Sequence, residues 1–243
     1  MPKTEKPAAN TKAVAKKADK PAARVRRDPA KTRASILRAA IAEFAAKGFS
    51  GARTDTIARR AKTNIRMLYH YFGGKDALYV CVLEEVLAQL RHEELQLDFD
   101  DVDPLDGILS MFDFIDNHFL KHPELQQLLA FENLNRAQHL KRSTRIPQMA
   151  SPVLELLRKL LKRGEANKTF RRGIDPLHLY VTMVSVVDYG KSHGFTLSHI
   201  FREDLFTSSW QADHREQMHQ ILISFLMPPA TPAKRVKRVK RKA

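Results

Sequence analysis

The sequence predicts an all-α protein, and three observations support this prediction. Apolar residues recur at the 3.6-residue spacing of a helix, most clearly over residues 36–44. No stretch combines sustained apolar-polar alternation with hairpin turns. Asp-Pro pairs stand at residues 28–29, 103–104 and 175–176, where aspartate can cap a helix and proline suits its first position. Helices are therefore expected to begin at these three points.

Glycines and polar turns divide the chain into further helices. Gly48 ends the first helix, Gly73 and Gly74 end the third, and the acidic stretch 98–104 forms a loop. The expected helices span residues 29–47, 54–61, 64–72, 75–95, 104–120, 123–137, 147–167, 175–190 and 213–227.

Composition restricts the class of protein. The chain has 243 residues and is 43% hydrophobic, so a real core is expected. The single cysteine, Cys81, cannot form an internal disulfide and fits a reducing cytosol. Residues 1–28 contain no apolar signal segment, and no later run approaches 18 apolar residues. We therefore expect neither secretion nor membrane association, and a cytoplasmic location.

The net charge of +15 is unevenly distributed along the chain. Residues 31–75 carry +8, whereas residues 76–227 carry −6. Residues 1–30 carry +6 and residues 228–243 carry +7. The two basic tails, residues 1–28 and 228–243, lack core-forming residues and are expected to be disordered. Such polarisation is typical of a chain of which one part meets a polyanion.

The short helices 54–61 and 64–72 have the spacing of a helix-turn-helix. On the second helix, Leu68 and Phe72 fall together and can pack against the preceding helices. The opposite face mixes cationic, aromatic and hydroxyl groups, which suits base edges and phosphates in a DNA major groove. His70 is at its centre, Arg66 and Met67 lie beside it, and Tyr69 and Tyr71 lie on its flanks.

A family resemblance extends over residues 32–83. The stretch contains the elements "F…GF", "T…IA…A", "LYxYF" and "K(D/E)AL" at matching spacing. The anchors are Phe44, Gly48, Phe49, Thr54, Ile57, Ala58, Ala61, Leu68, Tyr69, Tyr71, Phe72, Lys75, Ala77 and Leu78. In this pattern the chain resembles the N-terminal domain of TetR-type transcriptional regulators. The resemblance implies an N-terminal three-helix DNA-binding domain (residues 29–75) and a C-terminal helical domain for ligand binding and dimerisation (residues 76–227).

The turn and the reading face depart from the family pattern. Lys62, Thr63 and Asn64 stand where Gly-Val-Ser is usual, and Lys62 occupies a position that often requires a positive φ. Asn64 can still cap the following helix. Arg66 and Met67 replace a common Gly-Thr and are interpreted as this chain's own specificity, since arginine can pair with guanine and methionine can contact a thymine methyl.

Other roles follow from matching family positions. Thr54, Tyr69, Tyr71 and Lys75 match positions that contact phosphates, and Thr54 and Lys75 also stand at helix N-termini, which attract phosphate. An alternative for Tyr69 and Tyr71 is packing on neighbouring helices. The DNA-binding candidates are Thr54, Lys62, Thr63, Asn64, Arg66, Met67, Tyr69, His70, Tyr71 and Lys75.

The acidic body resembles the family mainly by position. The last two expected helices are apolar on more than one face, so a homodimer through them is expected, with a roughly palindromic operator. The resemblance implies a repressor that a small organic effector releases. An organic anion that meets Arg136 or His139 is one hypothesis, and ordinary core or surface roles are the alternative. The effector candidates are Met111, Phe114, His118, Phe131, Asn135, Arg136, His139, Tyr180 and Met183.

Two rival functions were weighed. An enzyme is not expected, because the sequence holds no phosphate-binding glycine loop and no nucleophile elbow. His118 and His122 are four residues apart but have no evident third ligand, so neither a metal nor another cofactor is expected. The other rival is a DNA-compacting protein that acts non-specifically through its basic tails. Either DNA-binding function would place the chain at the nucleoid.

Overall fold

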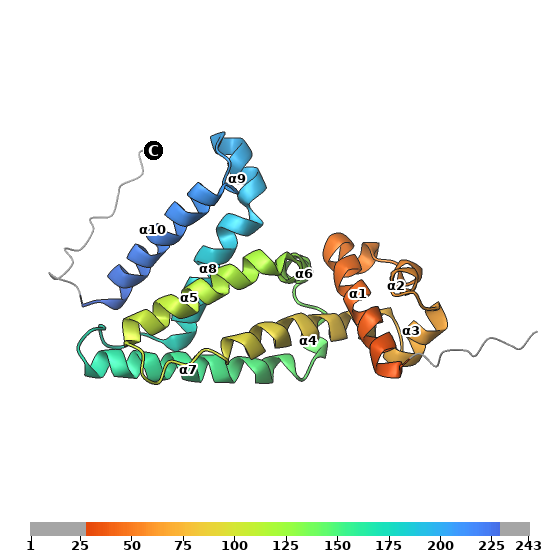
Figure 1. The fold of residues 1–243 in the computed structure, drawn as a ribbon, viewed down its shortest axis with the longest axis horizontal. Helices are drawn as coiled ribbons and strands as arrows, with labels where there is room; N and C mark the ends of the chain where they lie inside the picture. The colour runs from red at the N-terminus through yellow and green to blue at the C-terminus, as the bar shows by residue number, and fades with distance from the viewer. Residues whose placement is uncertain (1–27, 229–243) are drawn as a thin grey trace, which may run out of the picture.

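The computed structural model describes residues 28–228 of the chain, which form helices and no strand. The prediction of an all-α fold is therefore confirmed, while the expected disorder of the two basic tails falls on residues outside this range. The first three helices make one end of the molecule and the later helices make a larger body (Figure 1). In chain order the elements are α1 (Pro29–Gly51), α2 (Thr54–Arg60), α3 (Ile65–Phe72), α4 (Lys75–Glu94), α5 (Pro104–Lys121), α6 (Pro123–Leu134), the short 3-10 helix η1 (Leu140–Arg142), α7 (Ile146–Ala166), α8 (Pro176–Ser192), α9 (Gly194–Phe201) and α10 (Ser208–Leu226).

All three Asp-Pro pairs start helices, as predicted. The side chains of Asp28, Asp103 and Asp175 each accept a hydrogen bond of 2.8 to 2.9 Å from a backbone N–H two or three residues further on. Each following proline lies in the first turn of its helix, where no N–H donor is needed. These caps fix the starts of α1, α5 and α8.

The later helices differ from the expectation in three places. Helix α9 was not expected, because its eight residues are too short and too apolar to show a period. Helix α10 begins at Ser208 rather than 213, because Thr207 Oγ1 accepts a hydrogen bond from the Trp210 N–H at 3.3 Å. Helix α6 ends at Leu134 rather than 137, because Arg136 and Ala137 adopt positive φ angles of 55° and 56°.

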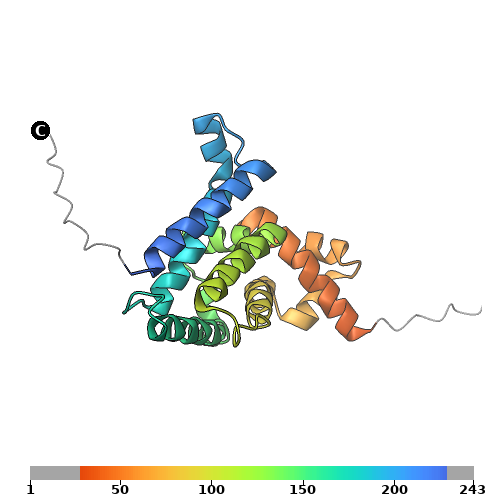
Figure 2. The same ribbon diagram turned by 60° about the vertical axis from the view of Figure 1, so that its left-hand side comes forward.

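The small domain is built on the core that the helical spacing predicted. Leu68 and Phe72 of α3 are buried and join Ile57, Ala61 and Phe44 in one apolar cluster. That cluster is continuous with the core of the body. Helix α4 provides much of this continuity, because it starts beside α3 and runs into the body (Figures 1 and 2).

A second connection joins α6 to the C-terminal end of α1. Gly48 adopts φ 65°, and a Cβ atom there would lie 2.8 Å from the Phe131 ring. The His139 ring lies 4.3 Å from the Phe49 ring and 4.8 Å from the Tyr79 ring, measured between centroids. The stretch 131–139 therefore forms an aromatic junction between the small domain and the body.

The junction is closed by a buried polar cluster. Glu132 lies 2.8 Å from His139 Nδ1, and its other oxygen accepts hydrogen bonds from the His139 and Leu140 N–H groups at 3.1 Å. Glu132 and His139 are 1% and 2% exposed. Burial, together with the nearby Glu132 carboxylate, raises the pKa of Tyr79, whose hydroxyl therefore stays protonated. This buried polar cluster thus helps to hold the small domain on the body.

One buried carboxylate holds α2 on α1. Glu43 of α1 is fully buried and lies 3.0 Å from Lys47 and 2.8 Å from Arg60 of α2. Burial pushes the pKa of Glu43 upward, but the interactions with Lys47 and Arg60 outweigh it and hold that pKa below its ordinary value.

We predict that Glu43→Gln lowers the free energy of unfolding by about 1–2 kcal/mol at pH 7, because it removes a buried charge from two cations that water can still reach. A carboxyl with a depressed folded-state pKa stabilises above its ordinary pKa. The difference between wild type and variant should therefore narrow as the pH falls below the ordinary value of 4.5. Urea unfolding at several pH values measures it. Glu155→Gln, at a largely exposed ion pair with Arg158, is the matched control and should change stability little; equal losses in both variants would contradict this account.

Candidate functional site

The turn between α2 and α3 has the geometry that the sequence indicated. Lys62 adopts φ 52°, in the left-handed region that the family pattern fills with glycine. Asn64 then caps α3, because its Oδ1 accepts a hydrogen bond from the Met67 N–H at 2.9 Å. A departure from the usual turn residues therefore leaves both the turn and the helix start intact.

Several of the residues predicted to contact DNA bases are exposed on the outward face of α3. Arg66, Tyr69 and His70 are exposed, and 46% of the Tyr69 side chain is open to solvent. Met67 is partly buried at the edge of this face. Tyr71 is also partly buried and packs against the core, as its alternative role proposed, while its ring meets that of His70 at 5.3 Å. Cationic and aromatic groups therefore stand together on a helix that is free to enter a groove.

The DNA-binding candidates beside the outward face of α3 differ in exposure and in direction. Lys75, at the start of α4, directs its ammonium group back to α1, 3.5 Å from the Ser50 carbonyl oxygen and 4.8 Å from the Phe49 ring centroid. Thr54 and Thr63 are partly buried beside the turn. The phosphate-contact roles of these residues remain predictions.

Two exposed arginines of this region were missed as candidates. Arg53 precedes α2, and Arg59 lies on α2 with its guanidinium 3.3 Å from Thr56 Oγ1. The signal that could have found them is the +8 charge of residues 31–75. That region has only two acidic residues, Asp55 and the buried Glu43. The field around α2 and α3 is therefore positive, which favours a polyanion.

The predicted effector residues of the stretch 131–139 lie at the junction. Phe131 packs on Gly48, and His139 is held by Glu132. The Asn135 amide donates to the Phe131 carbonyl oxygen at 2.7 Å, and Arg136 is exposed in the turn after α6. Phe131 and His139 therefore connect the domains, whereas Asn135 and Arg136 lie on the surface beside them.

The remaining predicted effector residues are spread through the body. Met111 and Met183 are fully buried in the core. Phe114 is partly buried, 5.8 Å from the ring of the buried His118. The Tyr180 hydroxyl accepts a hydrogen bond from Arg91 at 2.7 Å and donates one to Glu94 at 3.0 Å. Burial raises the pKa of Glu94. The structure does not bring the nine candidates together around one cavity.

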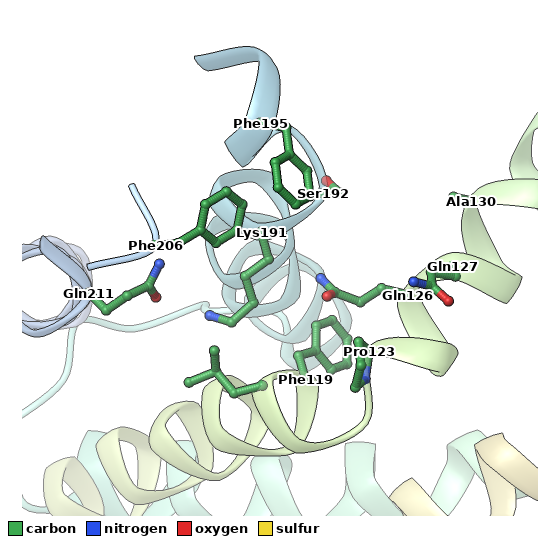
Figure 3. A pocket seen from close by; sticks show the side chains of 11 residues that line it. Phe119, Pro123, Gln126, Gln127, Ala130, Lys191, Ser192, Phe195, Phe206 and Gln211 are labelled. Carbon is green, nitrogen blue, oxygen red and sulfur yellow. The ribbon is translucent and has the colours of Figure 1, made fainter. Parts of the chain in front are cut away.

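A cavity of about 410 Å³ lies elsewhere, between α5, α6, α8 and the start of α9. Figure 3 shows Phe195 and Phe206 on one side, Phe119 and Pro123 on the other, and Lys191 between them. None of the nine predicted effector residues lines it. Its walls are formed by Phe119, Leu120, Pro123, Gln126, Gln127, Ala130, Lys191, Ser192, Phe195, Phe206 and Gln211.

Lys191 is the one charged residue among those that line the cavity. Its Nζ contacts one oxygen of Asp116, and Arg215 contacts the other oxygen at 2.8 Å. Asp116 and Arg215 themselves lie behind the cavity lining. Volume, aromatic walls and a cation together suit a small organic molecule with a negative group.

Among the helices of residues 28–228, none is long and apolar enough to cross a membrane.

Comparison with known proteins agrees with this geometry. Residues 36–81 match the model of bacterial regulatory proteins of the tetR family, and residues 104–222 match the tetracyclin repressor-like C-terminal domain. The chain is 34% identical over 183 residues to the transcriptional repressor NicS of Pseudomonas putida. That match spans 75% of this chain and 86% of NicS. It is 40% identical over 108 residues to the transcriptional repressor SCO4008 of Streptomyces coelicolor. That match spans 44% of this chain and 53% of SCO4008.

A solved structure shows the same fold. The transcriptional regulator SCO4942 of Streptomyces coelicolor superposes with a TM-score of 0.60 at 24% identity, over 78% of this chain and 97% of that one. The helix-turn-helix, the helical body and the matched relatives agree: the chain belongs to the tetR family and is a DNA-binding transcriptional regulator.

Proposed function

We propose that the protein is a homodimeric repressor that reads a palindromic operator with α3 and releases it when a small organic anion binds the body. The observation that carries this proposal is the exposed cationic and aromatic face of α3, fixed by the Asn64 cap. The names of the relatives NicS and SCO4008, both repressors, support the direction of regulation. Such a regulator acts at the nucleoid, in the cytoplasm.

Sequence reading is assigned to Arg66. Its exposed side chain lies at the start of α3, directly after the loop that joins α2 to α3. A guanidinium can donate two parallel hydrogen bonds to O6 and N7 of guanine, a pattern that no other base pair offers in the major groove. Tyr69 and His70, further along the same face, are proposed to complete the contact.

We predict that Arg66→Ala weakens operator binding by about 1–3 kcal/mol and relaxes base preference at one symmetric pair of positions. Selection of bound duplexes from a random pool, at near-physiological salt, measures both effects. Arg158→Ala, at an exposed arginine of α7 in the body, is the matched control and should keep the wild-type preference. An unchanged base preference in Arg66→Ala would show that Arg66 does not contact the bases. If the wild-type protein enriches no sequence at all, non-specific compaction through the tails would be favoured instead.

Dimerisation is assigned to the end of the body formed by α8, α9 and α10, on the side remote from α1–α3 (Figures 1 and 2). Nine of the fourteen exposed large apolar residues of the described chain fall within residues 177–227. Such a concentration is typical of a surface covered by a partner. The nine are Leu177, Val181, Tyr189, Phe195, Ile200, Phe201, Phe206, Ile221 and Met227.

We predict that the double variant Val181→Glu, Ile221→Glu is monomeric, because each carboxylate would be buried without a partner in the dimer. Both side chains are about half exposed in the single chain (53% and 52%), so the protomer should still fold. Sedimentation equilibrium reports the mass, and thermal unfolding reports the fold. Leu134→Glu, 80% exposed at the other end of the body, should remain dimeric. A dimeric double variant would place the interface elsewhere.

The effector is assigned to the cavity beside Lys191. Helix α6 contributes four of its lining residues, from Pro123 to Ala130, and the next residue, Phe131, packs on Gly48 of α1. A shift of α6 on filling the cavity would therefore reach the small domain directly. An effector releases the operator only if it binds the DNA-incompetent spacing of the dimer more tightly than the competent one.

We predict that Lys191→Met raises the concentration of effector needed to release the operator by roughly 10- to 100-fold, as expected for loss of a hydrogen bond to a charged group. Arg215 still pairs with Asp116 in this variant, so the fold should hold. A thermal-shift panel of small aromatic and aliphatic carboxylates selects the compound, and operator release measures the effect. Lys121→Met, at the exposed end of α5, is the control. Equal response of both variants would place the effector outside this cavity.

A further inference from the structure

Three side chains that can bind a metal ion meet where α4 ends and α5 joins α6. Glu93 lies in the last turn of α4, and His118 and His122 lie one turn apart at the end of α5. One ligand atom from each lies within 4.8 Å of the other two. The sequence offered the two histidines but no third ligand. The fold supplies it from a residue 25 positions away in the chain.

The spacing is close to that of a tetrahedral site. His118 Nδ1 and Glu93 Oε2 are 3.0 Å apart, and the two imidazole rings are 4.5 Å apart between centroids. Ligands bonded to zinc at roughly 2.0–2.1 Å lie roughly 3.3 Å from one another. Two of the three ligand atoms thus already have nearly the required separation, and the third needs a shift of at most about 1.5 Å, because no two of them are more than 4.8 Å apart.

Neighbouring groups orient the cluster. Gln89 Nε2 lies 3.1 Å from Glu93 Oε1 and 3.4 Å from His122 Nε2, so it bridges two of the three ligands. Glu124 Oε1 lies 3.4 Å from His122 Nδ1. A carboxylate on the second ring nitrogen is the usual support of a metal-bound histidine, since it fixes the ring and raises its basicity.

Access and selectivity also fit. The His118 side chain is 2% exposed, whereas Glu93 and His122 are 38% and 28% exposed, so an ion can enter from solvent and keep a water ligand. Two imidazoles and one carboxylate favour zinc and its neighbours over magnesium or calcium, which prefer oxygen ligands. The alternative is a simple histidine–carboxylate ion pair such as His178 with Asp175, but among residues 28–228 that pair has no third ligand group beside it.

We propose that Glu93, His118 and His122 bind a divalent transition-metal ion of the zinc class, one per protomer. The ion would link the last turn of α4 to the α5–α6 corner. Helix α4 starts in the small domain at Lys75, and α6 contacts α1 through Phe131, so both arms of this corner lead to the DNA-binding domain. Metal occupancy would restrain the position of that domain on the body. The site shares no residue with the effector cavity, although Phe119 and Pro123 of the cavity wall directly follow the ligands His118 and His122 in the chain.

The test uses tag-free, chelator-treated full-length protein. Titration with Zn²⁺ by calorimetry should give one ion per protomer, and Co²⁺ should give the visible absorption of a low-coordinate site. Zinc should also raise the thermal midpoint, because an ion that binds only the folded state stabilises it. His122→Ala and Glu93→Gln, both at partly exposed positions, should each weaken binding by at least about 10-fold. His178→Ala and Lys191→Met should bind as wild type.

The outcomes separate cleanly. Equal zinc affinity in wild type and His122→Ala would overturn the proposal, as would absence of zinc uptake by folded wild-type protein at micromolar metal. A Glu124→Gln variant adds a finer test, since loss of the carboxylate behind His122 should weaken binding without changing the stoichiometry.

Discussion

The structure depends on the buried junction between Glu132, His139 and the rings of Phe49 and Tyr79. A small three-helix domain has too little core to hold a fixed orientation by itself. At this junction α6 rests on Gly48, where a side chain would collide with Phe131, and the Glu132 carboxylate satisfies the backbone that follows. Breaking it would leave a carboxylate or an imidazole buried without its partner, which is costly. Helix α3, as part of this small domain, therefore keeps its position relative to the body.

That constraint makes the body a suitable place for control. Helix α6 carries cavity-lining residues in its first two turns and the junction contact at Phe131. Helix α4 carries Lys75 beside α1 and Glu93 beside the two histidines of α5. Two helices thus connect the proposed effector cavity and the proposed metal site to one docked domain. On this proposal, small shifts at either site would be transmitted, because packed interfaces move as units rather than deform.

The sequence predicted what local chemistry decides. Aspartate caps, glycine stops and 3.6-residue spacing placed the starts of α1, α5 and α8 and the inward face of α3. It could not predict that Glu93 would reach His118, or that Lys191 would face Phe119 across a cavity, because tertiary packing brings those residues together. The sequence predicts Phe131 and His139 as effector residues, and their role at the junction appears only when α1 is placed against them.

The most direct test of the central claim is the structure of the protein bound to an operator selected from random sequence. The account predicts α3 in the major groove of each half-site, with Arg66 nitrogens about 2.7–3.2 Å from acceptors on a base edge and Leu68 still in the core. Duplex bound only by basic segments outside residues 28–228, with the outward face of α3 turned to solvent, would contradict it.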